Sequence, residues 1–129
     1  MGYLIATMTP PTTGAQTGRR STRVKLGGSV LAVVLLENGR QLRARMSQLS
    51  VNGGLLSLER PLDEGIKITV LFHVGSTTTR ARAVVMFPMW ATQGCLQPFR
   101  FSEIREENRI ALGRELDALV RAGAPEEEE

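Results

Sequence analysis

Three arginines near the start of the chain, Arg19, Arg20 and Arg23, are the residues best suited to binding a ligand. The chain holds 16 basic residues, of which 14 are Arg and 2 are Lys. A guanidinium group is planar and donates paired hydrogen bonds to a phosphate or to the edge of a guanine base. The arginine content therefore favours a ligand that carries phosphate. The alternative is a solvated basic segment with no specific ligand.

The charge is unevenly distributed along the chain. Residues 1–102 carry 12 basic and 4 acidic side chains, a net charge of +8, whereas residues 103–129 carry 4 basic and 9 acidic ones, a net charge of −5. The positive part attracts anions. Nucleic acid is a further candidate, but proteins that bind single strands stack the bases on aromatic side chains, and the aromatic content is only 5%. We therefore do not expect nucleic acid to be the partner.

Residue types used in catalysis are sparse. His73 is the only histidine and Cys95 the only cysteine, and neither belongs to a recognisable nucleophile–base or metal-binding pattern. Glycine-rich patterns that bind nucleotide phosphates in enzymes do not occur. We therefore expect no enzyme, no cofactor and no metal. The lone thiol and an apolar run of only seven residues at Val30–Leu36 favour a cytoplasmic protein without membrane insertion.

The middle of the chain has the alternation that is typical of β-strands. Apolar residues occupy every second position in residues 40–47, and arginines lie between them. Asn38-Gly39 suits a tight turn, so residues 29–37 and 40–47 are predicted to form a hairpin. Further strands are predicted at residues 55–59, 66–73, 79–87 and about 95–101. Short strands separated by turn signals predict a small antiparallel barrel or sandwich.

A helix is predicted from about Ser102, where the apolar period changes. Its apolar stripe comprises Ile104, Leu112, Leu116, Leu119 and Val120. We expect this stripe to pack on the barrel, with a homodimer contact as the second interpretation.

One folded domain is expected at residues 19–122. Residues 1–18 lack apolar periodicity and include Pro10-Pro11, which predicts a flexible N-terminal arm. Residues 123–129 end in four glutamates that repel one another, which predicts a disordered acidic tail.

Two short motifs flank the predicted hairpin. Arg19 and Arg23 have the spacing R-x-x-x-R, and residues 48–53 read Q-L-S-V-N-G. These motifs resemble the two signatures of the PilZ domain, R-x-x-x-R and D/N-x-S-x-x-G, with matches at Ser50 and Gly53. Gln48 stands where the family has Asp or Asn. With the strands and the closing helix, the resemblance covers about residues 19–120.

The resemblance implies a mainly β fold, a six- or seven-stranded antiparallel barrel of the split-barrel type with a C-terminal helix packed on it. It also implies a single-domain receptor for cyclic di-GMP, a bacterial second messenger. Such a receptor would change its N-terminal arm on binding and signal to a protein effector that the sequence does not identify. The residues implied as ligand contacts are Arg19, Arg20, Arg23, Gln48, Ser50, Gly53 and Gly54.

Each implied contact has a physical reason. Arg19 and Arg23 would donate to phosphate and to the guanine edge, and the Ser50 hydroxyl would hydrogen-bond the ligand. Gly53 would allow close approach of the backbone or a positive φ. The longer neutral amide of Gln48 accepts guanine N–H groups less strongly than a carboxylate does. Gln48 therefore supports an alternative, a degenerate PilZ module that does not bind the nucleotide and acts through protein–protein interaction.

Overall fold

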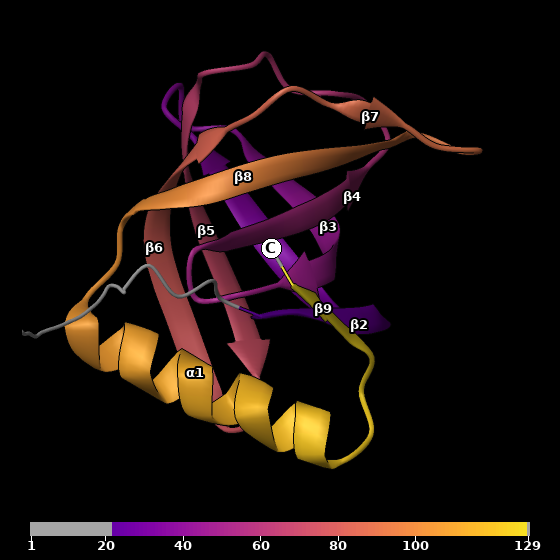
Figure 1. Cartoon of the computed structure of the whole chain (residues 1–129). Helices are drawn as coiled ribbons and strands as arrows, with labels where there is room; N and C mark the ends of the chain where they lie inside the picture. The colour runs from indigo at the N-terminus through magenta and orange to yellow at the C-terminus, as the bar shows by residue number, and fades with distance from the viewer. Residues whose placement is uncertain (1–21, 129) are drawn as a thin grey trace, which may run out of the picture.

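The computed structural model describes residues 22–128 (Figure 1). The predicted arm at residues 1–18, together with Arg19 and Arg20, lies outside the described residues. The elements are β2 (Thr22–Leu36), β3 (Gln41–Leu49), β4 (Gly53–Leu58), β5 (Lys67–Val74), β6 (Thr77–Val85), β7 (Met89–Trp90), β8 (Cys95–Glu103), α1 (Glu106–Arg121) and β9 (Glu126–Glu128).

Six strands form a closed antiparallel barrel. Their order is β3-β4-β8-β6-β5-β2, and the ring closes because β2 also pairs with β3. The short strands β7 and β9 extend the sheet by pairing with β8 and β2. Closure gives each strand of the ring two partners, which removes the exposed edges of an open sheet. The barrel and its C-terminal helix confirm the predicted fold class.

The core follows from the alternation along the strands. Val34 on β2 pairs with Val70 on β5, and both side chains are fully buried. On β3, Ala44 and Met46 are buried while Arg43 and Arg45, which alternate with them, are exposed. The two-residue period therefore separates an apolar interior from a basic exterior.

Strand β2 begins at Thr22, seven residues before the predicted start at Ser29. Its register against β3 shifts between Lys25 and Val30. Gly27 and Gly28 lie within this bulge with φ values of 63° and 78°, which side chains other than glycine rarely adopt. The two glycines interrupt the alternation of apolar and polar residues, so the sequence did not predict this part of the strand. Val24 and Leu26, which precede the glycines, are nevertheless buried as strand residues.

The helix α1 begins at Glu106 rather than at the predicted Ser102. The preceding strand β8 runs through Glu103, because Phe101 is buried and Glu103 still pairs with Arg82 on β6. Figure 1 shows α1 across one end of the barrel. Leu112 and Leu116 are buried in the core, and Ile104, Leu119 and Val120 pack partly buried against it. This arrangement confirms that the apolar stripe packs on the barrel.

The acidic end of the chain corrects a prediction. We expected residues 123–129 to be disordered, but Glu126–Glu128 form β9, which pairs with residues 22–24 of β2. The backbone N–H of Lys25 also donates to the carbonyl of Pro125 at 2.9 Å. Strand β5 pairs only with residues 32–36 of β2, and β9 pairs with the start of β2 at residues 22–24.

Candidate functional site

Arg23 and Gln48 lie together although 25 residues separate them in sequence. The Nη1 atom of Arg23 donates to Oε1 of Gln48 at 3.5 Å, a long hydrogen bond between two half-buried side chains. The register of β2 against β3 produces this contact, since Lys25 is opposite Gln48 and Val24 is opposite Leu49. The structure therefore brings one arginine of the first motif beside the first residue of the second motif.

Arg23 is part of the barrel wall. The neighbouring Val24 is buried in the core, so Arg23 points to the opposite side of the strand. In the register of β2 against β9, Arg23 is opposite Glu127. The guanidinium group is thus carried by a paired strand, which limits the conformations it has to lose when it binds an anion.

Ser50 belongs to the turn between β3 and β4. Its side chain is fully buried, its N–H donates to the carbonyl of Gly53 at 2.8 Å, and its Oγ accepts from the N–H of Asn52 at 3.1 Å. Its hydroxyl also lies 3.4 Å from the Gly53 carbonyl oxygen. In this structure the hydroxyl stabilises the turn that follows Gln48, and a direct contact with ligand stays a prediction.

Gly53 and Gly54 are required by packing between strands. A Cβ atom on Gly53 would lie 2.2 Å from the carbonyl oxygen of Phe99, and one on Gly54 would lie 2.6 Å from the carbonyl oxygen of Gln48. Neither residue has a positive φ, so the prediction that Gly53 provides a positive φ is wrong. The glycines allow β4 to approach β8 and the end of β3 closely.

Two arginines near this turn were missed by sequence reasoning. Arg109 on α1 donates from Nη1 to the carbonyl of Val51 at 2.9 Å and to Oδ1 of Asn52 at 3.3 Å, which ties the helix to the turn. Arg100 on β8 is exposed and lies opposite Gly53 in the register. No local pattern could have identified either residue, because each reaches the turn from a distant part of the chain.

The two titratable residues singled out in the sequence, Cys95 and His73, differ in their surroundings. Burial raises the pKa of the Cys95 thiol, which disfavours the reactive thiolate. His73 is exposed, and its Nδ1 lies 2.8 Å from the hydroxyl of Thr78. Within residues 22–128, no three His, Cys, Asp or Glu side chains are grouped so that they could hold a metal ion. In the same residues, no helix is long and apolar enough to cross a membrane. The arrangement around Arg23 is suited to binding an anion.

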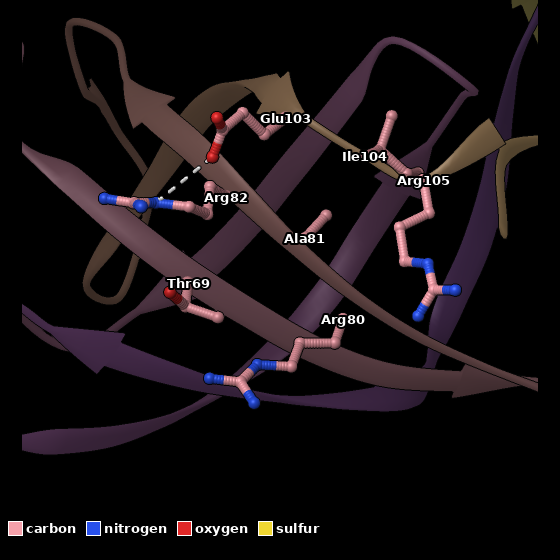
Figure 2. Close-up of a pocket in the computed structure, with 7 residues that line it drawn as sticks. All are labelled: Thr69, Arg80, Ala81, Arg82, Glu103, Ile104 and Arg105. Atoms are coloured by element: carbon pink, nitrogen blue, oxygen red, sulfur yellow. Dashed lines mark ion pairs between the residues drawn. The ribbon is translucent and has the colours of Figure 1, made fainter.

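A separate pocket of about 620 Å³ opens on the outer side of β6 (Figure 2). We call it the β6 pocket; its lining residues are Thr69, Arg80, Ala81, Arg82, Glu103, Ile104 and Arg105. None of the residues predicted as ligand contacts lines it. The β6 pocket is therefore separate from the described residues that are predicted to contact the ligand.

No protein-family profile and no curated protein sequence matches the chain. Several solved structures do share its fold. The inhibitor of motility MotI/DgrA from Bacillus subtilis aligns with a TM-score of 0.68 at 18% identity, covering 82% of this chain and 52% of that one. YcgR from Escherichia coli in complex with c-di-GMP aligns with a TM-score of 0.71 at 21% identity, covering 82% of this chain and 47% of that one.

The PilZ domain of YcgR with c-di-GMP gives a TM-score of 0.63 at 21% identity and covers 81% of this chain and 93% of the domain. This chain therefore spans about half the length of MotI/DgrA and YcgR, but nearly all of the isolated PilZ domain. These likenesses show that the chain has a PilZ-like fold.

Proposed function

We propose that this protein is a receptor for cyclic di-GMP, and the observation that carries the proposal is the contact between Arg23 and Gln48. Arg23 matches the first motif that resembles a PilZ signature, and Gln48 holds the position in the second motif where the family has Asp or Asn. The fold brings the two residues side by side. Two structures with this fold, YcgR and its isolated PilZ domain, are complexes with c-di-GMP. The ligand is a dianion with two guanines, which a guanidinium and an amide can bind together.

Arg23 would donate to a ligand phosphate or to the Hoogsteen edge of a guanine. Gln48 would accept from the guanine N–H groups once its amide oxygen is released from Arg23. Because the contact between them is long, exchanging it for a charge-assisted hydrogen bond to phosphate is favourable. Arg19 and Arg20 would complete the site. Arg19 precedes Arg23 by four residues, a reach of about 14 Å, so it can contact the same ligand.

The turn at residues 50–53 would act as a fixed wall of the site. Ser50 holds the turn internally, and Arg109 holds it from α1. Gly53 and Gly54 keep β4 close to β8 and to the end of β3. This rigid wall complements the N-terminal arm, whose rearrangement on binding forms the second part of the proposal.

We further propose that the protein is a cytoplasmic adaptor that passes the ligand signal to a protein effector. It would act by binding and not by catalysis, since the residues proposed to contact the ligand are mainly arginines and an amide. A degenerate module that acts only through protein interaction is the second candidate. Gln48 favours it, because the amide is longer than Asp or Asn and already engages Arg23.

Isothermal titration calorimetry of the full chain with cyclic di-GMP tests the proposal. We expect saturable binding of cyclic di-GMP, and GMP as the control should bind far more weakly because it lacks the second guanine and the ring of phosphates. If cyclic di-GMP fails to bind at millimolar concentration while circular dichroism shows an intact fold, the receptor proposal is wrong and the degenerate module replaces it.

A further inference from the structure

The outer surface of four neighbouring barrel strands carries apolar residues between two rows of arginines. Across β3, β2, β5 and β6, the register places Arg43, Val33, Leu71 and Arg80 in one line. The residues next to them along the strands, such as Val34, are buried in the core, so this line faces outward. Its two central members are apolar and its two outer members are cationic.

Beyond this line, an arginine flanks the apolar residues on one side only, since Leu35 is opposite Gln41 on β3. Toward one end, Leu35 on β2 is opposite Thr69 on β5, which is opposite Arg82 on β6. Toward the other end, Leu31 is opposite Arg45 on β3, and Leu31 is 63% exposed. We call this surface the arginine-flanked face; it comprises Leu31, Val33, Leu35, Thr69 and Leu71 with Arg43, Arg45, Arg80 and Arg82.

The dimensions of the arginine-flanked face fit an α-helix. Three strand spacings separate β3 from β6, a distance of about 14 Å. An α-helix with its side chains is about 10–12 Å wide. A helix lying along β2 and β5 would therefore cover the apolar residues and place its two flanks beside the two arginine rows. Arginine side chains are long enough to reach those flanks over the curved wall of the barrel.

The β6 pocket lies at one edge of this face and offers a place for an acidic side chain. In the view of Figure 2, the side chains of Arg80 and Arg82 extend on either side of Thr69. Nε of Arg82 lies 3.7 Å from a carboxylate oxygen of Glu103, but both side chains are largely exposed, so this ion pair is weak. A carboxylate from a partner can compete with Glu103 for the guanidinium.

We propose that the arginine-flanked face binds an acidic amphipathic helix of a partner protein. The apolar residues of the arginine-flanked face would bury the apolar face of the partner helix. The two arginine rows would pair with carboxylates on both flanks of that helix. Such charge complementarity selects partners and speeds their association. The face is distinct from the Arg23–Gln48 site, which lies beyond the Gly27-Gly28 bulge of β2.

This proposal rests on the adaptor role proposed above and specifies the kind of partner that the adaptor binds. Binding of the helix itself does not depend on binding of cyclic di-GMP. The two sites can be tested separately, because peptide binding and nucleotide binding are different measurements. Loss of one with retention of the other shows which proposal has failed.

A designed helical peptide labelled with fluorescein is the probe, with leucines on one face and glutamates on both flanks. Its fluorescence anisotropy is measured with the full chain at low and high salt. We expect saturable binding that weakens with salt. The double variant Arg43→Glu, Arg80→Glu should bind at least tenfold more weakly, while its affinity for cyclic di-GMP stays that of the wild type. The matched control, Arg60→Glu with Arg114→Glu, makes the same charge change at exposed residues outside the face and should leave peptide binding unchanged.

The same experiment can overturn the proposal. Equal affinity for a peptide with lysines in place of the glutamates, or equal loss in the control variant, would mean that binding is unspecific adsorption or a response to net charge. Absence of binding by the full chain would mean that nothing of this chemistry docks there. If sedimentation velocity then shows a dimer that Leu31→Glu dissociates, a second copy of the chain occupies the face instead.

Discussion

The guanidinium of Arg23 on β2 donates to the side-chain oxygen of Gln48 on β3 at 3.5 Å. The contact joins the two motifs into one surface and occupies the amide oxygen that a guanine would need. The side chain at position 48 therefore determines the contact of Arg23 without ligand, and it is also the proposed hydrogen-bond acceptor for the guanine.

Gln48→Asp is expected to tighten binding of cyclic di-GMP. A carboxylate accepts charge-assisted hydrogen bonds from guanine N–H groups, and the shorter side chain leaves more room beside Arg23. Tenfold tightening corresponds to about 1.4 kcal/mol. Calorimetry on both proteins measures the difference, with Gln41→Asp, an exposed position on the same strand, as the control. Weaker binding by Gln48→Asp than by the wild type would show that residue 48 is not a ligand acceptor.

Gly53→Ala is expected to destabilise the fold by about 1–3 kcal/mol, because the added Cβ would meet the backbone of Phe99 at 2.2 Å. Gly113→Ala in α1 is the matched control. Its Cβ would lie 3.5 Å from the nearest atom, a methyl of Val51, and alanine favours a helix over glycine by about 0.5–1 kcal/mol. Urea unfolding of the two variants should therefore give shifts of opposite sign. A Gly53→Ala protein as stable as the wild type would remove the packing explanation for this glycine.

The stability of the protein is expected to depend on Glu115 in acid. Hydrogen bonds from the hydroxyls of Ser76 and Thr77 and from the N–H of Ser76 lower the pKa of Glu115 below its ordinary value of 4.5. A lowered folded-state pKa stabilises the fold above the ordinary pKa, and this contribution is lost as the pH falls through the folded-state value. The wild type should exceed Glu115→Gln in unfolding free energy at neutral pH, and the difference should shrink below pH ~4.5. A difference that is constant from neutral to acidic pH would show that the charge of Glu115 is not involved.

The strands and the helix were predictable where one local period ran without interruption. The alternation on β3 and the stripe at Leu112 and Leu116 located the barrel wall and the packed helix. The start of β2 was not predictable, because Gly27 and Gly28 form a bulge that breaks the alternation. The strand β9 was missed for another reason, since backbone pairing with β2 forms regardless of the side-chain charges that predict disorder.

The candidate site was predictable only as positions along the chain. The motifs located Arg23 and Gln48, but their contact depends on the register between β2 and β3, which the bulge sets. The hydrogen bonds of Ser50 within its turn and the contact of Arg109 with Val51 required the folded structure. Arg19 and Arg20 remain predictions from the motif.

The central claim is most directly tested by the dissociation constants of cyclic di-GMP for the wild type, Arg23→Ala and the control Arg60→Ala, measured by calorimetry on the full chain. The Arg23→Ala protein loses a charge-assisted contact, so its binding free energy for cyclic di-GMP should be weaker than that of the wild type by about 1.5–3 kcal/mol. The Arg60→Ala protein should bind as the wild type does. Circular dichroism must show that Arg23→Ala, a change within a barrel strand, keeps the fold. Equal affinity of the folded Arg23→Ala protein and the wild type would contradict the account.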